Sequence, residues 1–522
     1  MRPLVRPLQR RLPLQWQRQR RLSSETAHHP PRPNKERIVI LGSGWGGYTV
    51  SRKLSPKKFS PLVISPRSYF VFTPLLTSTA GGDLDFSHIV EPVRDPKIKV
   101  DFIQAAARGL DLEHKTVLCE PTVVKGGVTE THSEEDGGFR QTKKWEKGEA
   151  FEIPYDKLII SVGAISRTFK TPGVKDNAIF FRDIGDSRRV RRRVRECFEL
   201  AILPTTSAEM RRHLLHFAIV GAGPTGTELA ASLRDFIKSD LITLYPALEG
   251  IPRISLYDVA PKVLSMFDES LSRYAMDTMK SEGIDVQTSH HIQDLRWGAP
   301  GAEPPYEMDP RGCLTLTTKE EGQVGVGMCV WATGNAMNEF ITDSLREVKS
   351  FPRGSVLMKD GTPVQSTSSW TYKKAPKTGA LLVDGHLRVQ LENVAGETAV
   401  LSDVFALGDN AMPETGAPPA TAQATAQEAK WLATRLDRGD LEKTPGFSFH
   451  NMGTLAYVGD AKALMQLPEE EGKYLPQRLT GRTAWFVWNS AYLTMTISWR
   501  NKLRIVVRWL LNRVFGRDIS RY

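Results

Sequence analysis

Two glycine-rich turns constrain this chain more than any other feature of its sequence. They are Gly42-Ser43-Gly44-Trp45-Gly46-Gly47 and Gly221-Ala222-Gly223-Pro224-Thr225-Gly226, and each follows an apolar run and opens a helical pattern. Glycines at this spacing permit a tight turn, the close approach of a pyrophosphate, and close packing of the helix that follows. Two such units predict an α/β fold with two Rossmann-type dinucleotide-binding domains, one for a flavin and one for a nicotinamide.

The second turn carries a marker for the dinucleotide that it binds. The strand predicted over Ile254–Asp258 ends in Asp258, where an acid normally binds a ribose diol. A carboxylate there repels a 2′-phosphate, so it favours NADH over NADPH. Asp258 follows the turn by more than the roughly 20 residues that are usual, and prolines and a glycine within 239–253 indicate an inserted loop. The candidate NADH-binding residues are therefore Gly221, Gly223, Pro224, Thr225, Gly226 and Asp258.

The first turn lacks such an acid. The strand predicted after it, within 60–67, supplies Ser65 at the position where a carboxylate is expected, and Pro66 and Arg67 follow. The glycines of this turn still meet the same requirements for a dinucleotide as those of the second turn. The candidate cofactor-binding residues here are Gly42, Gly44, Gly46 and Gly47, together with Ser65, Pro66 and Arg67.

Three further strands end in small residues that let the chain pass close to a bound cofactor. They lie within Tyr155–Ala164, Met328–Asn335 and Asp403–Asp409. They supply as candidate cofactor-binding residues Gly163, Ala164, Ala332, Thr333, Gly334, Asn335, Gly408 and Asp409. An Asp at the last of these positions receives the ribityl hydroxyls of FAD in two-dinucleotide flavoproteins. The order of the strands thus predicts FAD at the first turn and NADH at the second, with the flavin domain split in sequence.

The N-terminal segment differs in composition from the rest of the chain. From Met1 to Ser24 there is no acid, and the segment contains Arg2, Arg6, Arg10, Arg11, Arg18, Arg20 and Arg21 among apolar residues. This composition is typical of a mitochondrial transit peptide, with a disordered basic tail as the alternative. Because these arginines supply most of the formal net charge of +11, the charge does not call for a nucleic-acid partner.

The cysteines exclude one kind of flavoprotein chemistry. Cys119, Cys197, Cys313 and Cys329 form no CxxC or CxxxxC pair, which argues against a redox-active disulfide beside the flavin and against a zinc site. We expect them to be buried packing residues. No Asp-rich calcium loop appears either, so the sequence predicts no metal.

From Arg37 to Tyr522 the chain resembles the type II NADH:quinone oxidoreductases, the alternative NADH dehydrogenases of mitochondria. The resemblance includes the stretch Ser65-Pro-Arg-Ser-Tyr-Phe-Val-Phe-Thr-Pro-Leu-Leu76, which in this family approaches the flavin and adds Thr73, Pro74 and Leu75 to the candidate site. Members with Ser-Pro-Arg at this point still bind FAD, so Ser65 fits a flavin turn.

The stretch Pro418–Ala429 is the most diagnostic part of the resemblance. Gln423 and Gln427 lie four residues apart, which places both amides on one helical face. In the family the segment that matches Ala422–Gln427 lies under the isoalloxazine ring and borders the quinone tunnel. The alternative is an ordinary alanine-rich helix start with two solvated glutamines.

Near the second turn, Glu228 matches a family glutamate close to the nicotinamide, and we expect it to tune transfer between the substrates. The alternative is an ordinary acid in the first turn of a helix, stabilised by the helix dipole. Ser232 departs from the acid expected at that point in the family.

The C-terminus predicts a membrane contact. Apolar residues recur with helical period, and arginines four apart fall on the other side. The apolar set is Leu503, Val506, Val507, Leu510, Leu511 and Val514, and the arginines are Arg500, Arg504 and Arg508. The uncharged stretch Ala484–Trp499 upstream is shorter than the roughly 20 residues of a spanning helix. We expect both to lie in the interface with arginines toward anionic lipid, and a packed dimer surface or core helix is the alternative.

The resemblance implies a single-subunit, non-proton-pumping NADH:ubiquinone oxidoreductase. It implies a non-covalent FAD that takes a hydride from NADH and passes two electrons to the quinone pool of the inner mitochondrial membrane, where the enzyme is peripheral and homodimeric. The implied domains are 1–34 (transit peptide or disordered), 35–205 (first part of the FAD domain), 206–370 (NADH domain), 371–445 (second part of the FAD domain with the quinone-site helix) and 446–522 (membrane association and dimerisation).

Three other functions are alternatives to this one. A sulfide:quinone oxidoreductase shares the scaffold, but it needs paired reactive cysteines and leaves Asp258 without a substrate. An apoptosis-inducing-factor-like NADH flavoprotein gives no reason for Gln423, Gln427 or the amphipathic tail. A catalytically silent membrane-bound scaffold is disfavoured by the complete glycine turns and by the intact Gly408-Asp409 pair.

Overall fold

The computed structural model describes residues 34–95, 98–123, 148–348, 350–352, 354–358, 362–364, 369–468 and 476–517. The predicted transit peptide lies outside these residues, as does most of the polar stretch 120–150. Contacts divide the chain into two compact units. The first comprises Met1–Ser68, Pro92–Gly163 and Met337–Phe449, and the second comprises Tyr69–Glu91, Ala164–Ala336 and His450–Tyr522.

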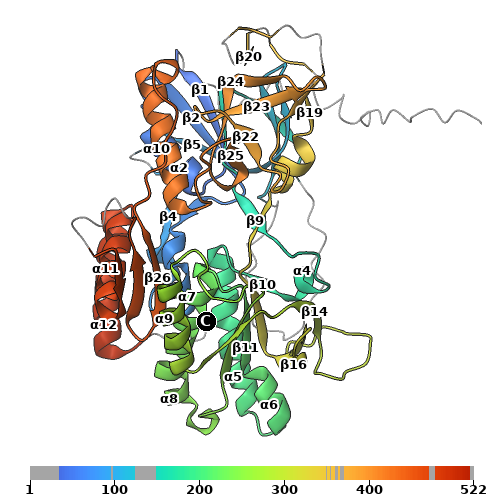
Figure 1. Ribbon diagram of the computed structural model, residues 1–522, viewed down its shortest axis with the longest axis vertical. Coiled ribbons are helices and arrows are strands. Elements are labelled where there is room, and N and C mark those ends of the chain that lie inside the picture. Colours follow the sequence, from blue (N-terminus) through green and yellow to red (C-terminus); the bar gives the residue numbers. More distant parts are fainter. Residues whose placement is uncertain are drawn as a thin grey trace, which may run out of the picture. The chain divides into compact units, whose positions relative to one another are not determined.

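A parallel sheet forms the centre of the first unit. Its strands run in the order β24 (Thr398–Ala406), β8 (Lys157–Ile160), β1 (Glu36–Leu41), β2 (Phe59–Ser65) and β5 (Asp101–Asp111). Ile38, Val39 and Ile40 are all inaccessible to solvent, because the strand is covered on both faces. The helices α2 (Trp45–Lys53) and α10 (Ala422–Arg438) pack against each other beside this sheet (Figure 1).

Antiparallel strands extend this sheet at both edges. They are β23 (Arg388–Asn393), β21 (Trp370–Tyr372) and β19 (Glu347–Val348) on the β24 side, and β6 (Thr116–Pro121) and β7 (Phe151–Pro154) on the β5 side. Off this path, β20 (Val356–Met358) pairs with β24, and β22 (Leu381–Val383) pairs with β23 and with β25 (Ala411–Pro413).

The second unit contains a second parallel sheet. Its order is β10 (Ile179–Phe180), β17 (Met328–Trp331), β11 (His216–Val220), β12 (Arg253–Asp258) and β13 (Ile284–Thr288). The helices α5 (Ile184–Ile202), α7 (Pro224–Phe236) and α9 (Glu269–Ser281) pack on it. An antiparallel sheet of β14 (Ile292–Trp297), β15 (Leu314–Thr318) and β16 (Gly322–Val326) shares a core with it through Leu314, Leu316 and Val326.

The C-terminal part of the second unit is a three-stranded sheet followed by two helices. The strands are β26 (Thr454–Gly459), β27 (Lys462–Gln466) and β28 (Arg478–Thr480), and the helices are α11 (Gly481–Met495) and α12 (Trp499–Phe515). The strand β26 packs against α7. No helix within the described ranges is both long enough and apolar enough to cross a bilayer.

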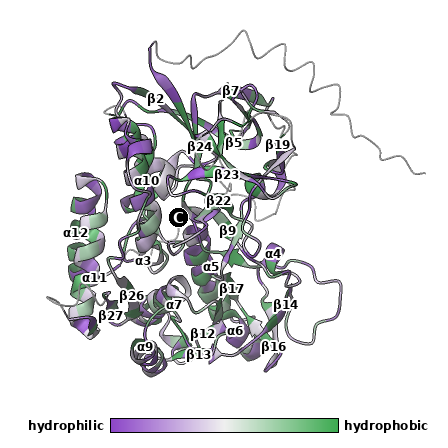
Figure 2. Ribbon diagram, turned by 45° about the horizontal axis from the view of Figure 1, so that its top comes forward, coloured by the Kyte–Doolittle hydropathy of each residue, from purple (hydrophilic) through white to green (hydrophobic). Residues whose placement is uncertain are grey.

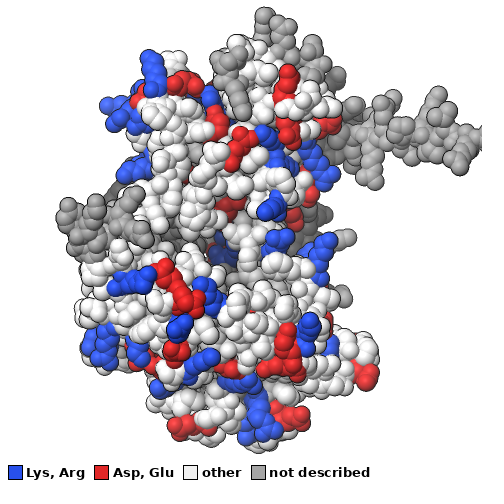
Figure 3. Space-filling view, viewed as in Figure 1, with Lys and Arg blue, Asp and Glu red and all other residues white. Residues whose placement is uncertain are grey.

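Short elements complete the two units. They are β3 (Tyr69–Val71), η1 (Thr73–Leu75), α3 (Leu76–Ala80), η2 (Phe86–His88), β4 (Val90–Pro92), β9 (Ala164–Ser166), α4 (Val174–Asn177), α6 (Ala208–Leu214), η3 (Ile237–Leu241), α8 (Ile242–Leu244), η4 (Pro246–Leu248), β18 (Asn335–Met337), η5 (Phe340–Ser344), η6 (Gly408–Asn410) and η7 (Leu441–Lys443). On the face of the molecule in Figure 3, basic and acidic side chains are interspersed.

The helix α12 docks by a narrow polar face. Asn501 and Ile505 are buried, and the Asn501 side-chain amide donates to the Val90 carbonyl and to Glu91 Oε1, both at 3.0 Å. At the other end Asn512 donates to the Asp83 carbonyl at 2.7 Å. The predicted apolar stripe faces outward instead, with Leu503, Leu510 and Val514 between 61% and 71% exposed. Figure 2 shows apolar and polar residues alternating along α11 and α12.

Three local expectations need correction. The inserted loop predicted over 239–253 begins with helical turns, because α7 continues directly into η3 and α8, and the first proline comes only at Pro246. The polar composition of residues 296–327 predicts surface hairpins or loops, and β15 and β16 do form a hairpin, but Leu314, Leu316 and Val326 in it are buried. Residues 350–377, which we also expect to form a surface excursion, contribute β20 and β21 to the first sheet and bury Trp370.

The units also divide the chain at other points than the predicted domain boundaries. Residues 164–205, which we expect in the flavin domain, belong to the second unit, where α5 packs on β17. Residues 337–370, expected in the NADH domain, belong to the first unit, because β19, β20 and β21 pair within its sheet. Which cofactor each unit takes stays a prediction.

The side chain of Arg193 ties α5 to the loop before β15 and to the residue before β17. Its guanidinium donates to the carbonyls of Pro310, Gly312 and Gly327 at 2.7 to 2.9 Å. We expect Arg193→Lys to lower the free energy of unfolding by about 2 kcal/mol, since an ammonium cannot reach all three carbonyls. Thermal and denaturant unfolding measure this, with the exposed Arg192→Lys as the matched control. Equal stabilities of the two variants would contradict it.

Candidate functional site

The first glycine turn joins β1 to α2 in the first unit. Gly42 has a φ of +106°, and a Cβ there would lie 2.1 Å from the Ser161 carbonyl oxygen. A Cβ on Gly47 would lie 1.9 Å from the Gly42 carbonyl oxygen, so the start of α2 packs directly against the turn. A Cβ on Gly44, in contrast, would meet no protein atom within 4 Å. The protein itself therefore gives no reason for a glycine at 44, as expected where a ligand approaches the backbone.

The second turn repeats this arrangement in the second unit. Gly221 has a φ of +107°, and its Cβ would lie 2.6 Å from the Ala332 carbonyl oxygen. A Cβ on Gly226 would lie 1.9 Å from the Gly221 carbonyl oxygen, as a Cβ on Gly47 would from that of Gly42. A Cβ on Gly223 would meet no protein atom within 4 Å. Pro224 and Thr225 open α7, with Gly223 as its N-cap. Each turn thus leaves backbone amides at a helix start, where phosphate binds.

The two turns differ at the end of the neighbouring strand. Gly42 N–H donates to the Ile64 carbonyl and Gly221 N–H to the Tyr257 carbonyl, so the next residues, Ser65 and Asp258, occupy equivalent positions. Asp258 accepts the Ala222 N–H at 2.5 Å and the Ala260 N–H at 2.8 Å. A carboxylate with about four lone-pair positions can still accept from a ribose diol.

Ser65 is buried and bonded within the protein. Its Oγ lies 3.0 Å from Ser43 Oγ and accepts the Arg67 N–H at 3.2 Å. Because Ser43 Oγ donates to the Arg67 carbonyl at 3.0 Å, the Ser65 hydroxyl is left to donate to Ser43. Ser65 therefore shapes the turn, and a flavin role for Ser65, Pro66 and Arg67 stays a prediction.

Asn410 is a residue that the sequence reading missed. It is inaccessible to solvent, its side-chain oxygen accepts the Gly163 N–H, and its amide donates to the Ile160 carbonyl, both at 3.1 Å. It holds the predicted residue Gly163 beside the turn that carries Gly408 and Asp409. Its position in the sequence, directly after the Gly408-Asp409 pair, could have identified it as a candidate.

Glu428 is a second missed residue and anchors the same turn. Its Oε2 accepts the Gly408 N–H at 2.7 Å from the buried face of α10. Burial raises the pKa of Glu428 to about 7, and the nearby Asp409 adds to this, while the bond from Gly408 opposes it. Gln423 and Gln427 lie on the same helix, half-buried, with Ala422 at its first position. The structure thus brings these predicted residues to the helix that holds the Gly408 turn.

Glu228 lies in α7, just past the second turn, and it is 7% exposed. Its Oε1 accepts the Tyr457 N–H at 3.1 Å and the Trp488 indole N–H at 3.4 Å. Burial raises its pKa to about 7, and these two bonds oppose the shift. Glu228 is therefore not a solvated helix acid: strand β26 and helix α11 enclose it.

Ser232 sits one turn further along α7, where the family acid was expected. It is 2% exposed, and a Cβ on Gly81 would lie 3.1 Å from the Ser232 Cβ. The residue after α3 thus approaches α7 so closely that a longer acidic side chain would have to displace it.

The remaining predicted residues fall into the second unit. Ala332 and Gly334 lie close to the chain just after Ala164: the Arg167 N–H donates to the Gly334 carbonyl and Thr333 Oγ1 donates to the Arg167 carbonyl, both at 2.9 Å. The Asn335 side chain accepts from Arg182, which also donates to the Ala164 carbonyl. Thr73, Pro74 and Leu75 form η1. Their cofactor-binding roles stay predictions.

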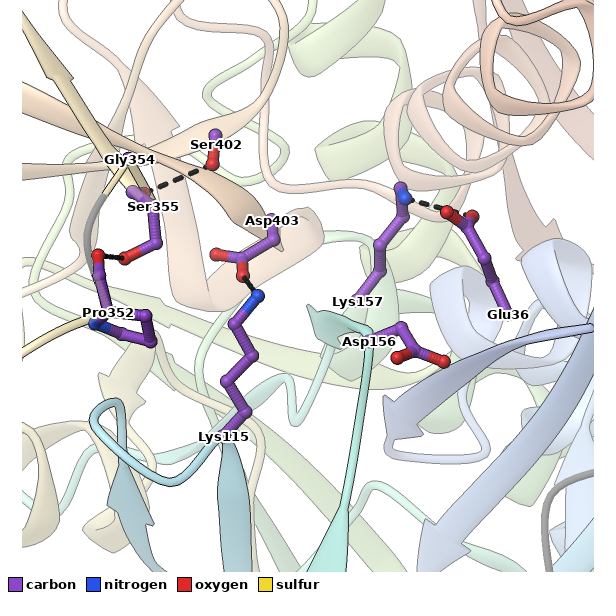
Figure 4. A pocket seen from close by; sticks show the side chains of 9 residues that line it. All are labelled: Glu36, Lys115, Asp156, Lys157, Pro352, Gly354, Ser355, Ser402 and Asp403. Atoms are coloured by element: carbon purple, nitrogen blue, oxygen red, sulfur yellow. Dashed lines mark hydrogen bonds and ion pairs between the residues drawn. The ribbon is translucent and has the colours of Figure 1, made fainter. Parts of the chain in front are cut away.

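A hollow of about 380 Å³ in the first unit lies away from the glycine turn. Its lining includes Glu36, Asp156 and Asp403, at the amino ends or edges of strands whose carboxyl ends carry the turn (Figure 4). Lys115 pairs with Asp403 at 2.5 Å and Lys157 with Glu36 at 2.9 Å. Because the hollow lies at the amino end of β1, whereas the glycine turn follows the carboxyl end of that strand, we do not assign it to the cofactor.

All four cysteines are buried free thiols, as predicted. Burial raises the pKa of Cys119, Cys197 and Cys329 to about 12 and that of Cys313 to about 11. These thiols are poor nucleophiles at neutral pH. Within the described ranges, no group of three or more His, Cys, Asp or Glu side chains is arranged to hold a metal ion.

Comparison with known proteins places this geometry in context. Residues 36–367 match the pyridine nucleotide-disulphide oxidoreductase family, and residues 451–518 match the NDH2 C-terminal domain. A probable NADH dehydrogenase of Dictyostelium discoideum is 32% identical over 93% of this chain and 91% of that protein. A mitochondrial external alternative NADH-ubiquinone oxidoreductase of Yarrowia lipolytica is 31% identical over 94% of this chain and 82% of that protein.

Solved structures agree in fold. NDH2 from Plasmodium falciparum in complex with NADH aligns with 93% of this chain and 100% of that one, at a TM-score of 0.72 and 23% identity. A sulfide:quinone oxidoreductase from Aquifex aeolicus aligns with 92% and 96% of the two chains at a TM-score of 0.56 and 15% identity. At these identities the likeness shows the shared fold alone.

The two kinds of glycine in a turn predict opposite outcomes of substitution. Gly226→Ala drives a Cβ into a backbone carbonyl, so we expect the free energy of unfolding to fall by about 3 kcal/mol. Gly223→Ala meets no protein atom, so we expect a change within about 0.5 kcal/mol and a loss of nucleotide affinity. Thermal unfolding without nucleotide, and NADH titration, measure the pair. Equal destabilisation by both variants would mean that Gly223 is structural.

The raised pKa of Glu428 predicts a pH-dependent stability. Between its ordinary value of 4.5 and about 7 the folded state binds the proton that the unfolded state releases, so stability falls as pH rises. Relative to Glu428→Gln, we expect the wild-type protein to lose up to about 3 kcal/mol across this window. Parallel unfolding curves of the two proteins at all pH values would contradict this.

Proposed function

The chain belongs to the pyridine nucleotide-disulphide oxidoreductase family, in its alternative NADH dehydrogenase branch, and from this premise we propose a function. We infer that it is a single-subunit NADH:ubiquinone oxidoreductase that pumps no protons. The proposal rests on the pair of glycine turns. In both turns a Cβ on the middle glycine, Gly44 or Gly223, would meet no protein atom. The turns differ in the residue that ends the neighbouring strand, which is Ser65 beside the first and Asp258 beside the second.

The first unit supplies the residues that would hold FAD non-covalently. The amides around Gly44 suit a pyrophosphate, and Asp409 lies in the turn that Asn410 and Glu428 fix from two sides. When bound, the flavin supplies the hydride and two-electron chemistry that the protein side chains lack.

The second unit supplies the residues that would hold NADH. Gly223 leaves space for the pyrophosphate, and Asp258, already fixed by two backbone amides, presents a charge that suits a free ribose diol. Fixed positions reduce the entropy lost on reaching a reactive arrangement.

Glu228 is the side chain best suited to proton exchange. Its pKa of about 7 lets it gain and lose a proton near neutral pH. One of its oxygens accepts both hydrogen bonds from β26 and α11, and the other has no partner among the described residues. Since reduction of a quinone to a quinol consumes two protons, a carboxyl of this kind suits the exchange between substrates that we expect of Glu228.

Gln423 and Gln427 are proposed to border the quinone. They share one face of the helix whose buried face holds the Gly408 turn through Glu428. An amide at this point can donate to a quinone carbonyl without adding charge.

The C-terminal helices are proposed to bind the membrane surface. The helix α12 docks on the protein by Asn501, Ile505 and Asn512, which leaves the apolar stripe exposed. A helix with this exposed stripe and flanking arginines suits an anionic bilayer interface. We infer a peripheral enzyme of the inner mitochondrial membrane, with a homodimer formed through the same C-terminal region.

An anaerobic stopped-flow experiment tests the function. We expect NADH to bleach the flavin absorbance of the purified chain and a short-chain ubiquinone to restore it. Substituting bulky residues for both Gln423 and Gln427 should slow the second step and leave the first intact. Absence of a flavin band would favour a silent scaffold, bleaching by sulfide would favour a sulfide:quinone oxidoreductase, and loss of the NADH step in the variant would refute the quinone role.

Asp258 predicts the choice of electron donor. Replacing it by Asn removes the charge while keeping an acceptor for Ala222 N–H. We expect the preference for NADH over NADPH, measured as the ratio of kcat/KM values, to fall about tenfold or more, since the repulsion of a 2′-phosphate disappears. An unchanged ratio would show that Asp258 does not set the donor.

A further inference from the structure

Four arginines lie around the one-turn helix η2 (Phe86–His88) in the second unit, and one of them, Arg191 of α5, has its guanidinium carbon 5.8 Å from the centre of the Phe86 ring. Arg188, from α5, places its guanidinium carbon 5.1 Å from the centre of the Phe86 ring. Arg504 and Arg508 come from α12, which packs against η2. Burial lowers the pKa of His88, Asp85 opposes this shift, and the charges of Arg508 and Arg504 lower the pKa further. We call Arg188, Arg504 and Arg508 the η2 arginine cluster.

The acids near the cluster are engaged elsewhere. Arg517 binds Asp83 at 2.8 Å and Asp240 at 2.7 Å. Asp85 caps η2 by accepting the Ser87 N–H at 2.8 Å. Within the described part of the chain, no acid lies within ion-pair distance of Arg188, Arg504 or Arg508. The segment between α5 and α12 therefore carries an excess of positive charge.

One member of the cluster has an unsatisfied donor. The Nε of Arg508 is inaccessible to solvent and has no hydrogen-bond partner. A buried N–H group without a partner is costly, and the cost is greater for a charged group. An anion bound beside η2 would supply the missing acceptor.

The cluster borders the exposed apolar stripe of α12. Arg504 and Arg508 each follow an exposed apolar residue, Leu503 and Val507, and lie on the flank between that stripe and the docked face of Asn501 and Ile505. An interfacial helix inserts its apolar face to the boundary of headgroups and acyl chains. Guanidiniums on its flank then lie at the depth of the lipid phosphates, which they bind in bidentate fashion.

We propose that the η2 arginine cluster is a binding site for the phosphate of an anionic phospholipid. The site extends membrane recognition beyond the C-terminal helices, because Arg188 belongs to α5, on the nucleotide-binding sheet. The occupant is a lipid headgroup rather than free phosphate, since the cluster is continuous with the exposed apolar stripe of α12, which suits acyl chains. The site rests on the proposed membrane association of α12.

Vesicle binding of the flavin-loaded full chain tests the site. The probes are vesicles of phosphatidylcholine alone and vesicles that also contain phosphatidylglycerol. We expect Arg188→Gln to weaken binding to the anionic vesicles about fivefold, as is typical for one basic residue near a charged surface. Binding to the neutral vesicles should not change. Combining it with Arg504→Gln and Arg508→Gln should weaken anionic binding about a hundredfold.

The matched control is Arg189→Gln, an exposed neighbour on α5 that pairs with Asp186 at 2.5 Å. Equal effects of Arg188→Gln and Arg189→Gln would overturn the site, because general charge would then explain both. Release of the wild-type chain from anionic vesicles by inorganic phosphate, but not by chloride at equal ionic strength, would overturn the lipid as occupant. Unfolding midpoints and NADH oxidation with a soluble quinone confirm that each variant is folded.

A separate variant tests the proposal on which the site rests. Serine at both Leu503 and Leu510 should abolish binding to neutral and anionic vesicles alike, since it removes apolar area from the exposed stripe. Retained binding to both would refute membrane association through α12, whatever the result for Arg188.

Discussion

The fold depends on one backbone contact that occurs twice. In each turn the last glycine packs against the carbonyl of the first, Gly47 on Gly42 and Gly226 on Gly221, with no room for a Cβ. This contact brings a helix start directly to the carboxyl end of a strand, where the backbone amides of the turn suit a phosphate. Everything proposed for the two cofactors depends on those amides and on the residue that ends the next strand.

The C-terminal region contacts the nucleotide fold on one side and is proposed to contact the membrane surface on the other. On one side, β26 and α11 enclose Glu228, and burial raises the pKa of its carboxyl to about 7 although the hydrogen bonds from Tyr457 and Trp488 oppose the shift. On the other, α12 docks by Asn501, Ile505 and Asn512 and leaves most of its apolar residues exposed to solvent. This inversion of the usual pattern, in which apolar faces pack inward, is the strongest physical reason for a further partner on that face.

Much of this architecture was predictable because it depends on local pattern. Glycine spacing, buried strands and the helical period of 503–514 are short-range features, and β11 is the apolar run that comes before the second turn. The role of Ser65 was not predictable, because its hydroxyl is engaged by Ser43 across the turn. Asn410 and Glu428 were missed because their importance lies in backbone groups far away in sequence.

The two compact units depart from the predicted domain boundaries for a related reason. Whether residues 337–370 join one sheet or the other is decided by strand pairing with β23 and β24, which no local pattern reports. Likewise, only the close approach of Gly81 explains why Ser232 replaces an acid.

The central claim is that the two turns serve different cofactors. The most direct test compares Gly44→Ala with Gly223→Ala, by measuring the flavin content of each purified variant and the rate at which NADH bleaches the flavin that remains. The account predicts that Gly44→Ala loses flavin, whereas Gly223→Ala keeps it but is reduced slowly by NADH. Loss of flavin from Gly223→Ala with full retention in Gly44→Ala would contradict the assignment.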